Sequence, residues 1–217
     1  MFYEVDQHAQ SIRYFSRGVL YSQIDWSNLD RIVDSYRQRI QDWYFGPAKE
    51  LAKNWDFAFS VMALNCLLID TLSQYVAGRE SSRSNDFTEF IRKRLPRDYS
   101  CKLKTKIQHY DGREEKTLKD VASVLYYGFR CGILHLAHIP PYCGVAQEAK
   151  PVREVPGHVK YKKSGTCCPS IIVNPLTLLK DLEETFEAYL GNLKDRDQKN
   201  DHLRANFKEK FSSSFGE

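Results

Sequence analysis

The sequence predicts an all-α fold, a bundle of four to five main helices that carries one small inserted β-hairpin. In several long segments, apolar residues recur every three or four positions, and glycine or proline follows the end of most of these segments. Residues 142–173 lack this helical pattern. They are rich in glycine, proline and cysteine and contain short stretches in which apolar and polar residues alternate.

The length of 217 residues suits one well-cored domain with an arm and a tail. We expect an N-terminal arm at residues 1–27, a helical domain at 28–195 that includes the 142–173 insertion, and a charged C-terminal tail at 196–217. A hydrophobic content of 42% with 13% aromatic residues supports a packed core and excludes wholesale disorder.

The arm is aromatic but has no sustained period, which predicts a packed arm or a short extra element. The first helix begins after Ser27 or Asn28, since either side chain can act as an N-cap, and Gly46-Pro47 ends or kinks it. Its apolar positions follow the spacing of one buried face: Leu29, Ile32, Val33, Tyr36, Ile40 and Trp43.

Residues 55–77 predict a second helix that is apolar on nearly all sides, as expected of a helix surrounded by others. Its length alone would allow a transmembrane span. Because Asn65, Asp70 and Gln74 interrupt the apolar run, we interpret it as a buried central helix and expect no membrane association.

A shorter amphipathic helix is expected to begin near Asp86 and to end before Pro96. Residues 97–117 alternate cations with apolar residues and then reach a turn at Asp111-Gly112. This pattern is interpreted as a short helix followed by a mobile loop. A late helix is predicted at residues 118–138.

Within the insertion, residues 155–162 and 167–173 alternate in hydrophobicity, which predicts a β-hairpin joined across residues 163–166. The last helix opens at Asn174-Pro175, an N-cap followed by proline, and ends near Leu193. The tail after it is interpreted as disordered or as an amphipathic helix that binds a partner; its apolar residues are Leu203, Phe207 and Phe211.

The six cysteines are scattered and no signal peptide is recognisable, which indicates a reduced, cytoplasmic protein. Five residues invite a zinc hypothesis: Cys143, Cys167, Cys168, His138 and His158. Because no pair of cysteines has the two-residue spacing of a zinc knuckle, we predict no metal and no cofactor. A zinc-stabilised adaptor is kept as the third alternative.

The net charge of +4 is too small to indicate a polyanionic partner by itself. Residues 92–106, however, contain seven cations and a single acid. Phosphate contacts to RNA are therefore predicted here, with a solvated helix face as the equal alternative. The residues selected for these contacts are Arg92, Arg94, Lys102 and Lys104.

Residues 125–138 place Arg130 and His135 in an otherwise apolar helical run. Histidine can transfer a proton near neutral pH, and guanidinium can bind two phosphate oxygens, which suits attack of a ribose 2′-hydroxyl on its own phosphate. The alternative is structural, with Arg130 paired to a core carboxylate such as Asp70 and His135 favouring the helix dipole.

Five positions on a helix correspond to a rise of about 7.5 Å and a rotation of about 140°, so Arg130 and His135 are not expected to stack directly. A two-fold-related copy of the helix would bring a second pair alongside, which predicts a homodimer. Gly128 and Gly132 remove bulk beside Arg130 and would admit a partner helix or a substrate backbone.

Tyr126 and Tyr127 lie one turn before Arg130. They can stack on a base or donate a hydroxyl to phosphate, and are therefore candidates for substrate binding. The alternative is that both are half-buried core residues with a hydrated hydroxyl.

The run from Phe129 to His135, with arginine, four intervening residues and histidine on a late helix, resembles the R-x4-6-H motif of the HEPN superfamily. The resemblance covers residues 28–195 in expected architecture but only this run in motif. It implies a dimerising helical bundle with a metal-independent endoribonuclease site, in which Arg130 stabilises the charge and His135 is the general acid or base. It also implies a prokaryotic defence, toxin or RNA-processing role, with an antitoxin or regulator as a possible partner.

The sequence departs from the family pattern directly after the arginine, where active members commonly carry asparagine or aspartate and this chain has Cys131. A thiol is only a weak hydrogen-bonding group. A non-catalytic HEPN-like module that dimerises and binds a protein or nucleic acid is therefore kept as the alternative to cleavage of RNA.

Overall fold

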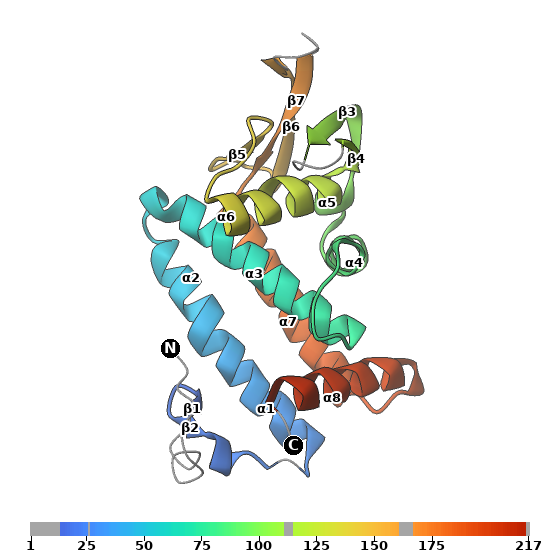
Figure 1. Cartoon of the computed structure of the whole chain (residues 1–217). Coiled ribbons are helices and arrows are strands. Elements are labelled where there is room, and N and C mark those ends of the chain that lie inside the picture. Colours follow the sequence, from blue (N-terminus) through green and yellow to red (C-terminus); the bar gives the residue numbers. More distant parts are fainter. Residues whose placement is uncertain (1–13, 26, 111–114, 161–166, 216–217) are drawn as a thin grey trace.

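The computed structural model describes residues 14–25, 27–110, 115–160 and 167–215. Over these residues the fold is mixed α/β, so the predicted all-α class is wrong: long helices are accompanied by three small sheets. Figure 1 shows the long helices packed side by side, with the two sheets formed by residues 102–173 at one end and the small sheet of residues 14–20 toward the other. The first thirteen residues of the expected arm and the turns at residues 111–112 and 163–166 lie outside the described residues.

The first long helix consists of α1 (Leu29–Ile40), a π-helical turn (Gln41–Phe45) and α2 (Gly46–Leu51). Asn28 is its N-cap, accepting hydrogen bonds from two backbone N–H groups of the first turn. The helix continues past Gly46-Pro47, because Pro47 occupies the first turn of α2, where no backbone donor is needed after the wider π turn.

Helix α3 (Ala58–Ala77) follows a short 3-10 turn (Trp55–Phe57) and packs against α4, α7 and α8. Gly78 ends it in the left-handed conformation. Among the described helices, only residues 55–77 are long and apolar enough to cross a membrane, and half of their most apolar stretch is buried inside the protein. A core helix passes the same test.

Helix α4 (Ser84–Arg94) and a 3-10 turn (Arg97–Ser100) lead into strands β3 (Lys102–Tyr110) and β4 (Glu115–Asp120). The two strands pair antiparallel, so the expected short helix and mobile loop are replaced by a β-hairpin. The physical reason is the alternation itself: Ile107 and Leu118 form a buried cross-strand pair while the lysines between the apolar residues of β3 face solvent.

The late helix is continuous from α5 (Val121–Val124) through a π-helical segment (Leu125–Arg130) to α6 (Cys131–Leu136). Asp120, the last residue of β4, caps it by accepting from the Ser123 N–H. Figure 1 shows this helix crossing one end of α3, with β3, β4 and the strands that follow the helix on its other side.

The predicted hairpin is present as β6 (Val152–Lys160) and β7 (Cys167–Val173), which pair antiparallel. A third strand, β5 (Cys143–Val145), pairs parallel with β7 and was not predicted. Three residues are too few to show a hydrophobic period, so only the neighbouring strand reveals β5.

Helix α7 (Pro175–Lys194) is capped by Asn174, and a 3-10 turn (Gln198–Asn200) joins it to α8 (Asp201–Phe215). The segment expected to be a charged tail therefore includes a helix of the core, since Leu203, Phe207 and Phe211 are buried. Strands β1 (Tyr14–Ser16) and β2 (Val19–Leu20) form a small hairpin whose Phe15 ring packs against Phe211.

Candidate functional site

The late helix brings Arg130 and His135 into direct contact within one chain. The guanidinium Nη1 lies 2.8 Å from the imidazole Nε2. The expectation that this spacing keeps them apart is corrected by side-chain length, because an arginine extended along the helix spans the five-residue rise. Since a guanidinium group can only donate, Arg130 donates this hydrogen bond and Nε2 accepts it, which assigns the ring proton of His135 to Nδ1.

Asp70 of α3 holds Arg130 from the other side. Its carboxylate accepts a hydrogen bond from Arg130 Nε at 3.2 Å, and the two side chains are only 15% and 18% exposed. Ser82 and Gln74 also donate to Asp70, at 2.6 Å and 3.2 Å. The carboxylate is therefore well satisfied and fixes the position of the guanidinium.

Burial disfavours the charged form of Arg130, but the neighbouring Asp70 carboxylate outweighs it and raises the pKa of the guanidinium above its usual value. The Tyr126 ring adds a cation–π contact, with its centre 5.7 Å from the Arg130 Cζ atom. Arg130 is thus a fixed cation, while His135 at the solvent surface is the exposed member of the pair.

Cys131 lies against the same cation. Partial burial raises the pKa of its thiol, although Arg130 and Tyr126 favour the thiolate. The thiol is therefore protonated at neutral pH and acts as a small, weakly polar wall of the site.

A series of aromatic and cationic contacts connects this pair to the β3–β4 hairpin. Tyr126 packs edge-on against Tyr127 with ring centres 4.9 Å apart. The Tyr127 ring in turn lies 5.0 Å from Lys116 Nζ and 5.7 Å from the His109 ring. Both predicted tyrosines are half-buried, so their rings pack in the fold while part of each surface stays open to solvent.

The two glycines beside Arg130, Gly128 and Gly132, allow close packing within the chain itself. A Cβ atom at Gly128 would lie 2.4 Å from Cys143 Sγ, and one at Gly132 would lie 2.5 Å from the His138 carbonyl oxygen. They admit the chain segment that follows the helix, instead of the partner helix or substrate backbone that the sequence suggested.

No family model, curated protein or solved structure matches this chain. The resemblance to HEPN proteins therefore rests on the Arg130–His135 motif alone.

The predicted phosphate-binding cations divide into two groups. Arg92 on α4 donates to Asp120 at 2.9 Å and 3.1 Å and so holds the hairpin against the helix, and Arg94 is half-buried. Lys102 and Lys104 are exposed on β3. Lys119, which the sequence analysis missed, joins them from β4; the pairing of two alternating strands was the signal that could have revealed it.

The zinc alternative finds no support in the described part of the chain, where no three histidine, cysteine, aspartate or glutamate side chains are placed to hold a metal. Cys143 and Cys168 are buried free thiols. The side chains of His158 and Cys167 lie outside the description.

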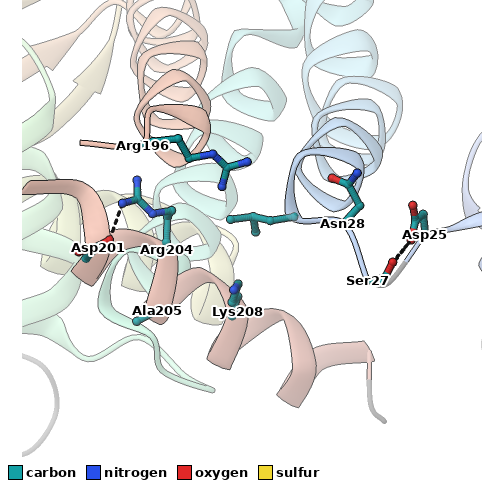
Figure 2. Close-up of a pocket in the computed structure, with 9 residues that line it drawn as sticks. Asp25, Ser27, Asn28, Arg196, Asp201, Arg204, Ala205 and Lys208 are labelled. Carbon is teal, nitrogen blue, oxygen red and sulfur yellow. Dashed lines mark hydrogen bonds and ion pairs between the residues drawn. The ribbon is translucent and has the colours of Figure 1, made fainter. Parts of the chain in front are cut away.

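A hollow of about 700 Å³ lies far from Arg130 in the sequence, between the start of α1 and helix α8. Figure 2 shows Arg196, Arg204 and Lys208 around it. Arg196 pairs with Asp30, and Arg204 donates to Asp201 and to two backbone carbonyls. These arginines hold the turn between α7 and α8 in place, and acids share the hollow, so it shows no preference for an anion.

Proposed function

We propose that this protein is a metal-independent endoribonuclease, with Arg130 and His135 as its reacting pair. The observation that carries the proposal is the 2.8 Å contact between a fixed guanidinium and an exposed imidazole. A cation held next to a proton acceptor is what transfer of a phosphodiester to a neighbouring hydroxyl requires.

In the proposed reaction, the phosphate of the RNA takes the place of His135 as the acceptor for Arg130, which frees the Nε2 lone pair. Nε2 then removes the proton of the 2′-hydroxyl, and the 2′-oxygen attacks phosphorus. The bond from phosphorus to the 5′-oxygen breaks, which leaves a 2′,3′-cyclic phosphate and a 5′-hydroxyl. Arg130 stabilises the charge that grows on the phosphate oxygens.

Asp70 is a positioning residue in this proposal, since it acts through Arg130 and not on the RNA. Its hydrogen bond occupies Nε, so the terminal nitrogens of the guanidinium can bind phosphate once Nη1 has released His135. Preorganisation of this kind lowers the cost of orienting the cation at the moment of reaction.

The departing 5′-oxygen needs a proton while His135 is taking one, and a second copy of the chain can supply it. Apolar surface adjoins the pair: Leu136, next to His135, is 65% exposed, and Leu67, one turn before Asp70 on α3, is 37% exposed. We therefore include in the proposal a homodimer through this helix, in which His135 of the second copy is protonated, is turned away from its own Arg130, and gives its proton to the 5′-oxygen. An antitoxin or regulator would compete for the same surface.

The alternative function is a non-catalytic dimerisation and binding module with the same helix at its interface. The ion pair between Arg130 and Asp70 favours it, because an arginine satisfied by a core carboxylate also stabilises a fold without any reaction. Cys131 in place of a polar residue favours it as well.

The deciding experiment incubates the purified protein with single-stranded RNA in EDTA. We expect cleavage that yields 2′,3′-cyclic phosphate ends, and a fall of 100-fold or more in Arg130→Ala and His135→Ala. His138→Ala is the matched control, since His138 is also exposed on this segment and its ring Nδ1 lies 3.4 Å from the Leu136 carbonyl oxygen, away from Arg130.

The variants must keep the circular dichroism spectrum and the oligomeric state of the wild type. Cleavage that survives in His135→Ala, or that is equally reduced in His138→Ala, would overturn the assignment. RNA with a 2′-deoxyribose at the scissile position must resist cleavage, because the proposed nucleophile is then missing.

A further inference from the structure

The β3–β4 hairpin presents a group of lysines that the fold does not use. Lys102, Lys104 and Lys106 on β3 and Lys119 on β4 are all exposed. Among the described residues, none of these four ammonium groups has a carboxylate within 4.0 Å. We call these four residues the hairpin lysines.

The neighbouring helix shows the contrast. On α4, Arg92 is paired with Asp120 and Lys93 with Glu89. Two acids beside the hairpin lysines have other partners: Asp120 accepts from Arg92, and Glu154 accepts from the backbone N–H of Lys104. A two-stranded sheet with several unbalanced cations attracts a polyanion more strongly than a helix whose charges are matched.

Contacts run from this hairpin to the proposed reacting pair without a break. A hydrogen bond of 2.6 Å joins His109 Nδ1 of β3 to the Tyr142 hydroxyl and attaches the hairpin to the segment after the late helix. Lys116 of β4 lies over Tyr127, Tyr127 meets Tyr126, and Tyr126 meets Arg130. The cations of the hairpin therefore adjoin two half-buried aromatic rings, and these rings adjoin the Arg130 guanidinium.

We propose that the β3–β4 hairpin is the RNA-binding arm of this protein. The hairpin lysines bind consecutive phosphates of a single-stranded RNA, and Tyr127 and Tyr126 meet the bases where the strand enters the site. The inference rests on the proposed function and adds to it the substrate class and the path of the strand.

Single-stranded RNA fits better than the other polyanions. Aromatic side chains beside a row of cations bind bases that are free to unstack, and bases in a duplex are not. A lipid surface or an acidic protein would use the lysines but not the tyrosines. Successive outward residues on a strand are about 6.6 Å apart, so the lysines make a row of separate charges along the chain of phosphates.

The test uses the full chain carrying His135→Ala, so that binding is measured without cleavage. Lys104→Ala, Lys106→Ala and Lys119→Ala are combined, and the affinity for a fluorescein-labelled 20-nucleotide single-stranded RNA is measured by anisotropy at several salt concentrations. We expect a loss of affinity of 10-fold or more at low salt. The slope of log affinity against log salt should decrease by about 2, since single strands contribute about 0.7 per phosphate contact.

The matched control combines Lys53→Ala, Lys93→Ala and Lys180→Ala. These lysines are also exposed, but each is paired with a glutamate in its own helix or turn. Both triple variants lower the net charge by three, from +4 to +1, so a difference between them reports the place of the charge and not its total. A third variant with arginine at positions 104, 106 and 119 should keep the affinity.

Equal affinities of the hairpin variant and the control would overturn the proposal, as would tighter binding of a 20-base-pair RNA duplex than of the single strand. The outcome is independent of cleavage. Suppose that the hairpin variant loses affinity for RNA, the control variant keeps it, and the wild type cleaves no RNA. The proposal that the hairpin binds RNA is then supported, and the endoribonuclease proposal fails.

Discussion

Arg130 is the residue on which the proposed chemistry depends, and different neighbours contact different parts of its guanidinium group. Nε is held by Asp70, one face lies near Tyr126, and Nη1 reaches His135. A partly buried cation of this kind needs its carboxylate, because an unpaired charge at this depth would be strongly destabilising. The same carboxylate leaves one edge of the guanidinium available to a phosphate.

Gly128 offers a test of the packing behind that residue. Gly128→Ala should lower the free energy of unfolding by about 1 to 3 kcal/mol, because its Cβ would overlap Cys143 Sγ at 2.4 Å. Gly191→Ala is the control: it lies on an exposed position of α7 with nothing within 4 Å, so it should stabilise by about 0.5 to 1 kcal/mol. Urea denaturation measures both, and a loss of stability in Gly191→Ala would contradict this account.

At the scale of elements, the late helix is shaped by the π-helical segment Leu125–Arg130. The segment ends with the Cys131 N–H donating to the Tyr126 carbonyl, five residues back. The wider turn changes the rotation of the helix just before Arg130, so α6 does not continue the face of α5. Arg130 therefore meets Asp70 on α3 while His135 lies at the surface.

Helix α8 packs into the core, although its sequence suggested a disordered tail or an amphipathic helix that binds a partner. Phe207 is fully buried, with its ring 5.4 Å from that of Tyr36 and 5.6 Å from that of Tyr75. Phe207→Ala should cost about 3 to 5 kcal/mol of stability. Phe57→Ala, at a position that is 45% exposed, should cost less than about 1 kcal/mol.

Thermal and urea unfolding, followed by circular dichroism, measure the stability of the Phe207→Ala and Phe57→Ala variants. A Phe207→Ala protein no less stable than Phe57→Ala would mean that α8 is attached loosely and contributes little to the core.

At the scale of the whole molecule, buried thiols make the fold sensitive to alkaline pH. Burial raises the pKa of Cys66 and Cys143 far above the usual value for a thiol. Above about pH 8.5 the unfolded chain releases these protons and the folded chain keeps them, so stability falls as pH rises.

We expect the free energy of unfolding to decrease by about 1 to 2 kcal/mol for each of the two thiols between pH 8.5 and 10. Urea titrations at a series of pH values measure it. In the double variant Cys66→Ala, Cys143→Ala the decrease should be shallower, whereas Cys101→Ala, at an exposed position, should leave the slope unchanged. A pH profile identical in all three proteins would contradict this explanation.

The whole molecule also depends on how its sheets join its helices. Asp120 ends β4, caps the late helix and pairs with Arg92 of α4, so one carboxylate fastens three elements. Tyr142 and His109 fasten the hairpin from the other side. The proposed binding arm is thereby fixed relative to Arg130 and His135.

The sequence by itself determined the features that depend on neighbouring residues. The caps at Asn28 and Asn174, the end of α3 at Gly78 and the β6–β7 hairpin follow from local propensity and period. The candidates Arg130 and His135 were also selected from the sequence, because two polar residues in an apolar run are visible without a structure.

Only the tertiary structure decided the features that join distant segments. The β3–β4 pairing overturned the all-α class, burial turned the expected tail into α8, and side-chain reach brought Arg130 to His135 across a spacing that had predicted separation. These outcomes depend on which surfaces meet and how far side chains extend. Local periodicity carries no information about either, so the site could be named from the sequence but its geometry could not.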